Sequence, residues 1–139
     1  MLKRIELVRN PKVGTGWVYN ITDGKWMKAI NPHWVKGTIV EADFLFEENK
    51  YYLVKYDDSS WKNIREYYEI LKVENDELKK VASFSRYNGN YEFEDEKIKQ
   101  LFIEFSTLKL EEQNDNEFGS VKINVIELAK FIVQKIQNQ

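Results

Sequence analysis

The sequence predicts an α+β protein in which an antiparallel β-barrel or strongly bent sheet is followed by helices. Through about Phe84, short segments rich in β-branched and aromatic residues alternate with turn residues. After residue 94, apolar residues recur at three- and four-residue steps. With 139 residues, the chain has the length of one domain. We therefore expect a single domain, 1–139, that is mainly β over 1–84 and mainly helical over 94–139.

The first strands are predicted from β-forming residues and from one turn signal. Residues 5–7 and 16–21 favour extended structure, and the Asp-Gly pair within 22–25 is typical of a hairpin whose return strand is 25–30. The Asn-Pro pair at 31–32 should interrupt the sheet, because proline has no N–H to donate to a neighbouring strand.

Two strands joined by a polar turn, and then one further hairpin, are predicted in the middle of the chain. Strands over 34–43 and 51–56 are separated by a polar turn at 47–50. Both faces of 51–56 carry aromatic or aliphatic bulk, so the second face either packs on the carboxy-terminal helices or is in part exposed for a partner. The turn-forming pair Asn75-Asp76 predicts a hairpin between strands 68–73 and 78–84.

Helical spacing begins after the acidic residues 94–96, which suit a helix amino terminus. A strand over 101–110 is the alternative for the first of these segments. The last segment has a capping residue, Asn124, and Glu127 three positions later. The two apolar stripes are Ile98, Leu101, Phe102, Phe105 and Leu108, and then Val125, Leu128, Ala129, Ile132, Val133 and Ile136.

The amino-acid composition excludes several kinds of site and class of protein. The chain has no cysteine, which excludes disulfides and thiolate sites, and no apolar run reaches the ~18 residues that a membrane span needs. We expect a soluble, cytoplasmic protein. The net charge of −2 is uneven: residues 1–40 hold seven Lys/Arg and two Asp/Glu, whereas 41–139 hold fourteen and twenty-one. Any nucleic-acid contact would therefore be local.

Two sets of residues could carry catalytic chemistry. His33 is the only histidine and stands beside a proline in a predicted turn. Asp57-Asp58 with Glu77-Leu78-Lys79 loosely resembles the acidic and lysine set of metal-dependent nucleases. In those enzymes the second carboxylate sits on a hydrophobic strand, whereas Glu77 directly follows a predicted turn. We expect no enzyme, no metal site and no cofactor.

Residues 34–73 carry a family resemblance. Lys36-Gly37-Thr38-Ile39 followed by Val54-Lys55-Tyr56-Asp57-Asp58 resembles the strand pair of Tudor and chromo-type SH3-like barrels. The resemblance implies an SH3-like barrel for this part of the chain. Many Tudor domains place a cage aromatic after the aspartate, where this chain has Ser59. The resemblance thus implies a fold and not a methyl-lysine site.

Twenty aromatic residues in a small chain suggest that some serve a partner. We expect a non-enzymatic protein that acts by protein–protein recognition, such as an inhibitor or immunity-type factor. The alternative is a nucleic-acid-binding module in which the basic first forty residues, with Trp17, Trp26 and Trp34, contact phosphates and stack on bases. The residues expected to bind the partner are Trp17, Trp34, Tyr56, Asp58 and Trp61.

Overall fold

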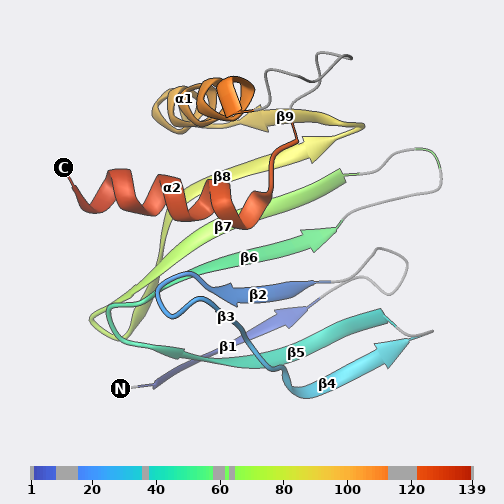
Figure 1. The fold of residues 1–139 in the computed structure, drawn as a ribbon. Helices are drawn as coiled ribbons and strands as arrows, with labels where there is room; N and C mark the ends of the chain where they lie inside the picture. Colours follow the sequence, from blue (N-terminus) through green and yellow to red (C-terminus); the bar gives the residue numbers. More distant parts are fainter. Residues whose placement is uncertain are drawn as a thin grey trace. The chain divides into compact units, whose positions relative to one another are not determined.

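The computed structural model describes residues 2–8, 16–35, 38–57, 62, 65–112 and 122–138. These residues divide between two compact units, Met1–Glu92 and Phe93–Gln139. Strands precede helices, which confirms the α+β class (Figure 1). The elements are β1 (Leu2–Val8), β2 (Trp17–Asn20), β3 (Lys25–Trp26), β4 (Ile30–Val35), β5 (Thr38–Glu47), β6 (Tyr51–Asp57), β7 (Arg65–Glu74), β8 (Glu77–Tyr87), β9 (Asn90–Phe93), α1 (Glu96–Glu112) and α2 (Val125–Gln137).

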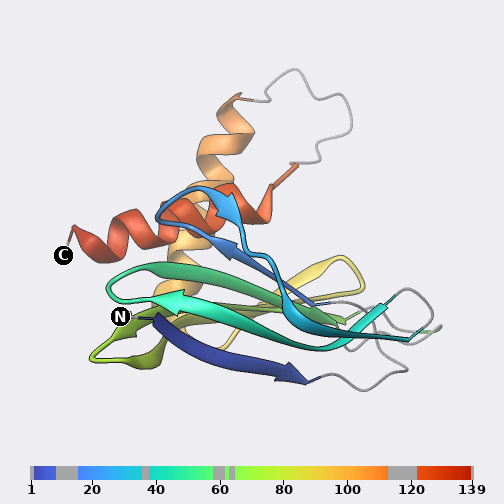
Figure 2. The ribbon, with the colours of Figure 1, turned by 90° about the horizontal axis from the view of Figure 1, so that it is seen from below.

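The described strands form two open sheets and do not close into a barrel. One sheet has the order β1-β5-β4 and the other the order β3-β2-β6-β7-β8-β9. Figure 2 shows β1 and β5 of the smaller sheet side by side, in antiparallel pairing. The stretch 34–73 is thus divided, with β4 and β5 in one sheet and β6 and β7 in the other. The chain changes sheets three times, between β1 and β2, between β3 and β4 and between β5 and β6.

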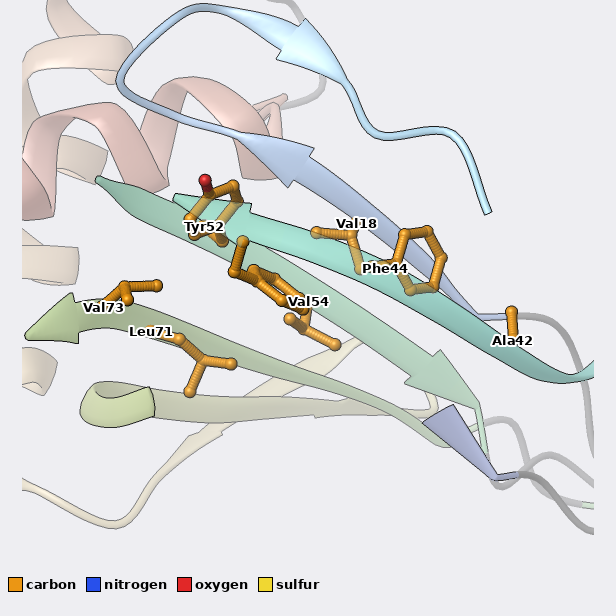
Figure 3. Close-up of a cluster of buried hydrophobic side chains, with 8 residues drawn as sticks. Val18, Ala42, Phe44, Tyr52, Val54, Leu71 and Val73 are labelled. Atoms are coloured by element: carbon orange, nitrogen blue, oxygen red, sulfur yellow. The ribbon is translucent and has the colours of Figure 1, made fainter. Parts of the chain in front are cut away.

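A hydrophobic core joins the two sheets. Alternate residues of β5 point toward β2, β6 and β7, since side chains on a strand alternate between its faces (Figure 3). Phe46 is fully buried, and its ring packs edge-on against Tyr52 with 4.7 Å between ring centroids. Burial of such side chains stabilises a fold by about 1.5–3 kcal/mol each. The core cluster comprises Val18, Ala42, Phe44, Phe46, Tyr52, Val54, Leu71 and Val73.

The strand β6 is buried on both faces over its first four residues. Tyr52 and Val54 belong to the core cluster, while Tyr51 and Leu53 alternate with them and are also buried. Ile70 lies opposite Leu53 on β7 and is fully buried as well. Both faces of the first half of β6 are therefore buried, so this half is not exposed for a partner.

The predicted hairpin turns are confirmed by backbone geometry. Gly24 has φ +68°, a conformation that glycine adopts without steric cost, in the turn between β2 and β3. Asn75 and Asp76 have φ of 55° and 64°, as a two-residue turn between twisted strands requires. Both of their backbone N–H groups donate to the Glu48 carboxylate, at 2.6 and 3.0 Å.

Two details of the strand prediction are wrong. The return strand after Gly24 is only Lys25–Trp26, and the predicted strand 34–43 is split, because β4 ends at Val35 and β5 begins at Thr38. Pro32 lies inside β4 and does not end the strand, but the regular pairing with β5 is interrupted at 31–32 as predicted. An edge strand tolerates proline, and β4 lies at an edge of its sheet with a register shift between Ile30 and His33.

The second unit contains both predicted helices. The α1 helix covers 96–112, so the alternative of a strand over 101–110 is wrong. Asn124 caps α2 as predicted: its side chain accepts hydrogen bonds from the Ile126 and Glu127 N–H groups, at 2.9 and 3.3 Å. The buried residues of the two helices are Ile98, Phe105, Leu128, Ala129, Ile132 and Val133. Neither of these helices is long and apolar enough to cross a membrane.

Candidate binding surface

A ten-residue segment, Lys25–Trp34, carries the only two tryptophans of the described chain that are more than half exposed. Trp26 is 58% exposed and Trp34 is 56% exposed. The segment leaves the edge of the larger sheet at β3 and enters the edge of the smaller sheet at β4. Every other described aromatic side chain is buried or half-buried. This crossing segment is therefore the part of the described chain where aromatic surface is accessible.

Side chains along the segment alternate between inward and outward positions, and this explains why Trp26 is exposed. Met27 and Ala29 are half-buried and pack against the core cluster, and the Met27 N–H donates to the Val18 carbonyl oxygen at 2.9 Å. Trp26 precedes Met27, and Lys28 lies between Met27 and Ala29. Both Trp26 and Lys28 are exposed. A chain in extended conformation turns successive side chains to opposite sides. Anchoring of the inward residues thus forces the tryptophan and the lysine outward.

The same segment borders a hollow of about 640 Å³, which we call the Trp26 hollow. This volume lies within the ~300–1,000 Å³ typical of ligand sites in proteins. Its lining combines apolar side chains of the segment with residues of β2 and β5. The lining residues are Asn20, Lys25, Trp26, Met27, Lys28, Ala29, Ile30, Leu45 and Glu47. A hollow with such a lining can receive an apolar side chain and place charged groups at its rim.

The ring of Trp26 is held in place although it is exposed. Its centroid lies 4.9 Å from that of Trp17 and 5.0 Å from that of Tyr19, and both contacts are edge-to-face. Such pairs contribute about 0.5–1.5 kcal/mol beyond burial. The indole therefore meets a partner in a fixed orientation, which lowers the entropy lost on binding.

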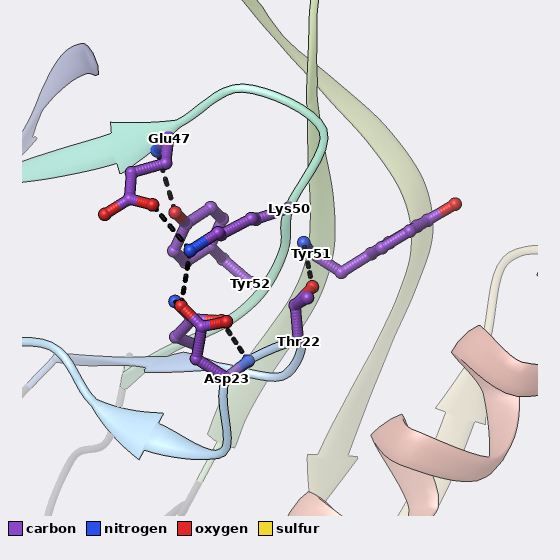
Figure 4. A network of polar contacts seen from close by, with 7 residues as sticks. Thr22, Asp23, Glu47, Lys50, Tyr51 and Tyr52 are labelled. Atoms are coloured by element: carbon purple, nitrogen blue, oxygen red, sulfur yellow. Dashed lines mark hydrogen bonds and ion pairs between the residues drawn. The ribbon is translucent and has the colours of Figure 1, made fainter. Parts of the chain in front are cut away.

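Two ion pairs of Lys50 connect the turns beside the hollow (Figure 4). Lys50 Nζ lies 2.6 Å from Asp23 Oδ2 and 2.5 Å from Glu47 Oε2. The hydrogen bond from Lys50 lowers the pKa of Asp23, and the hydrogen bonds to Asp23 and Glu47 raise the pKa of Lys50. We call these three residues the Lys50 clasp. It joins the β2–β3 turn to the β5–β6 turn.

Hydrogen bonds to the backbone reinforce these turns. The buried Asn20 side chain accepts from the Asp23 N–H at 2.8 Å, and Thr22 Oγ1 accepts from the Tyr51 N–H at 2.9 Å. The buried Tyr52 hydroxyl accepts from the Glu47 N–H at 2.8 Å. Burial is the main cause that raises the pKa of Tyr52. The wall of the hollow is thus preorganised by neutral and ionic contacts together.

Charged side chains of both signs surround the hollow. Among the described residues, neither Lys25 nor Lys28 forms an ion pair, and both are exposed. Asp23 and Glu47 share Lys50. Asp43 lies on the same face of β5 as Leu45 and Glu47 and pairs opposite Ile30. Three lysines and three carboxylates therefore lie at or beside the hollow.

The residues predicted to bind a partner are not gathered in one place. Trp34 lies on β4, and Trp17 is half-buried against Trp26. Tyr56 is half-buried, stacks on Tyr67 at 5.2 Å and donates to Glu69 at 3.0 Å. Trp17 lies opposite Lys55, so it and Tyr56 occupy opposite faces of the sheet. Asp58 and Trp61 lie outside the described residues.

Trp26, Lys25 and Lys28 are not among the residues that the sequence predicts to bind a partner. Trp26 entered only as a stacking residue of the nucleic-acid alternative. The signal that could have found them is the basic bias of residues 1–40 together with a tryptophan directly after an Asp-Gly turn. No local sequence pattern indicates the hollow, because Leu45 and Glu47 line it from a different hairpin.

A second cluster of charged side chains, on β6, β7 and β8, is internally paired. Lys55 Nζ lies 3.0 Å from Asp57 Oδ1 and 3.9 Å from Glu66 Oε1, and Arg86 lies 3.8 Å from Glu66 Oε2. The Tyr68 hydroxyl donates to Glu66 at 2.9 Å, and burial followed by this bond raises the pKa of Tyr68. Two cations balance two carboxylates here. The arrangement is typical of a structural network.

Within the described residues, Asp57 and Glu77 of the nuclease-like set lie far apart. Asp57 lies opposite Glu66 at one end of β7, whereas Glu77 lies opposite Glu74 at the other end. Glu66 and Glu74 are eight residue steps apart along β7, which corresponds to roughly 26 Å. In the part of the chain that the structure describes, no three histidine or acidic side chains converge to hold a metal ion.

Comparison of the chain with family models, with curated proteins and with solved structures finds no match. The inference of function therefore depends on the geometry of the site alone.

Proposed function

We propose that the chain is a non-enzymatic binding protein that recognises another protein through the Lys25–Trp34 segment. The observation that supports this proposal is the exposed but immobilised Trp26 at the rim of the hollow. Tryptophan is enriched among residues that dominate binding energy, and such residues pair with pockets. An inhibitor or immunity-type factor would act in this way, by occupying a surface of its target.

A second candidate is binding of single-stranded nucleic acid at the same place. It is supported by the order Lys25-Trp26-Met27-Lys28, in which an exposed indole stands between two exposed lysines. Aromatic rings stack on bases and lysines contact phosphates. The overall negative charge and the small number of unpaired lysines at the site favour the protein partner.

The test is recovery of the partner from a lysate of the native host, with protein and nucleic acid both analysed. We compare the unaltered chain with Trp26→Ala, Trp34→Ala and the control Leu110→Ala, which removes an exposed apolar side chain of α1 (49% exposed). A protein that the unaltered chain and the control recover, and that Trp26→Ala loses at unchanged melting temperature, supports the proposal. Equal recovery by all four chains contradicts it. Recovery of nucleic acid alone supports the second candidate.

A further inference from the structure

From the chemistry of the Trp26 hollow we infer that the partner inserts one uncharged aromatic side chain into it. This inference rests on the proposed function and adds the kind of group that meets Trp26. Three features of the hollow select such a group: the balance of charge around it, its apolar floor, and the presence of an indole and a thioether in its lining.

The charges at and beside the hollow balance one another. Three carboxylates stand against three lysines, and within this set Lys50 Nζ lies 2.6 Å from Asp23 Oδ2 and 2.5 Å from Glu47 Oε2. A charged group of either sign would therefore meet repulsion as well as attraction. Charge complementarity thus favours an occupant without charge. The six residues are Lys25, Lys28, Lys50, Asp23, Asp43 and Glu47.

The floor of the hollow favours an apolar group. Met27, Ala29 and Ile30 are half-buried parts of the lining, and the half-buried Leu45 joins them from β5. A polar group placed against these side chains would lose its hydrogen bonds with water and gain none in return, which is unfavourable. An apolar side chain instead gains free energy there, because its surface and that of the floor are both removed from water.

Two lining residues favour an aromatic ring over an aliphatic side chain. The ring of Trp26 is 58% exposed and is held by Trp17 and Tyr19, with centroid distances of 4.9 and 5.0 Å. Aromatic pairs attract each other beyond burial, because the positive edge of one ring meets the negative face of the other. The thioether of Met27 also contacts aromatic rings favourably. An aliphatic side chain in the hollow gains neither contact.

The balance of charge also favours a protein side chain over a nucleobase. A base is an aromatic ring as well, but each nucleotide brings a negatively charged phosphate, and nucleic-acid binding draws much of its affinity from phosphate contacts. Three carboxylates against three lysines give a row of phosphates no net attraction. The occupant is therefore a Phe, Tyr or Trp side chain of a partner protein.

The experiment selects binders from a display library of random short peptides. The full chain is the bait, and Trp26→Ala is used for counter-selection. Each enriched peptide is also made with its aromatic residue replaced by leucine. Affinities are measured on the unaltered chain and on three variants: Trp26→Leu, its matched control Trp26→Phe, which keeps a ring, and the charge reversal Lys25→Glu with Lys28→Glu. Melting curves of all chains establish that they are folded.

We expect enriched peptides that share a Phe, Tyr or Trp and show no excess of either charge. Replacement of that residue by leucine, or of Trp26 by leucine, should lower affinity about threefold to tenfold, since each removes one ring of the pair. Trp26→Phe and the charge reversal should each change affinity by less than about twofold.

Three other outcomes contradict the inference. Peptides that require Trp26 but carry only aliphatic or charged residues in common, or that bind equally well with leucine in place of the ring, overturn it and leave the proposed function intact. If no peptide requires Trp26, both are wrong. If a short oligothymidylate binds the chain instead and Trp26→Ala abolishes its binding, the nucleic-acid candidate replaces both.

Discussion

Lys50 Nζ lies 2.6 Å from Asp23 Oδ2, and this ion pair links two turns that are far apart in the sequence. Asp23 belongs to the turn between β2 and β3, and Lys50 to the turn between β5 and β6. Since β5 and β6 lie in different sheets, the second turn is one of the places where the chain changes sheets. The geometry of the hollow thus depends on a charge pair at the surface.

Acidification should weaken this link. The hydrogen bond from Lys50 lowers the pKa of Asp23 below its ordinary value of 3.8. A lowered pKa means that the stabilisation is present above about pH 4 and is lost as the pH falls through the pKa of the folded state. The raised pKa of Lys50 acts only at strongly alkaline pH and does not affect this range. We expect the unaltered chain to lose more of its melting temperature between pH 5 and pH 3 than Asp23→Asn does.

The control for this prediction is Asp95→Asn, because Asp95 lies in the other unit. Its carboxylate accepts a hydrogen bond from the Lys97 N–H at 2.7 Å and forms no ion pair with a lysine among the described residues. That variant should keep the acid sensitivity of the unaltered chain. Parallel melting curves for the unaltered chain and Asp23→Asn over the whole acid range would show that the clasp does not contribute to stability.

Replacement of Phe46 by alanine should test the core. Phe46 is fully buried between the sheets and contacts Tyr52, so its truncation should lower the free energy of unfolding by about 3–5 kcal/mol. Trp34→Ala removes an even larger side chain, but one that is 56% exposed, and should change stability by only about 0.5 kcal/mol. Urea denaturation of both variants measures the two values. Similar losses in the two variants would mean that Trp34 belongs to the core.

The features that sequence predicted well are those decided by neighbours in the chain. The Asp-Gly turn, the Asn75-Asp76 turn and the Asn124 cap each depend on the backbone preference or hydrogen bonding of a few adjacent residues. The helical stripe of α2 is equally local, and four of its six apolar residues are buried. Such signals survive in any tertiary context that leaves the segment intact.

The features that sequence missed are decided by distant pairing. Pro32 would break a central strand, but it is tolerated because β4 pairs on one side only in the described sheet. The assignment of β5 and β6 to different sheets follows from the core between them and not from the turn that connects them. Exposure of Trp26 depends on which neighbours enter the core, Met27 and Ala29, and no local pattern states this.

Replacement of Asn124 by alanine should destabilise α2. Its side chain satisfies two backbone N–H groups of the first turn, at 2.9 and 3.3 Å, and loss of such a cap costs about 0.5–2 kcal/mol. The measurement is the thermal loss of the helical circular dichroism signal. Asn124→Ser is the control, since serine keeps an acceptor at this position and should retain most of the stability. Equal melting of the alanine and serine variants would show that the cap contributes nothing.

Trp17 should support Trp26 through ring contact. The two rings are 4.9 Å apart at an interplanar angle of 79°, and Trp17 also lies 6.5 Å from Tyr68. In a double-mutant cycle of Trp17→Ala and Trp26→Ala, we expect a coupling in unfolding free energy of about 0.5–1.5 kcal/mol. Urea denaturation of the four chains gives this value. Because the contact also orients the indole, Trp17→Ala should weaken partner binding although Trp17 is half-buried.

The control cycle pairs Trp17→Ala with Trp34→Ala, since Trp34 is exposed on β4 and forms no ring contact with Trp17 among the described residues. Distant changes of this kind add within about 0.5 kcal/mol. If the Trp17 and Trp26 variants were equally additive, the edge-to-face contact would not hold the indole. Trp26 would then reorient freely, and a partner would meet a mobile ring whose ordering it must itself supply.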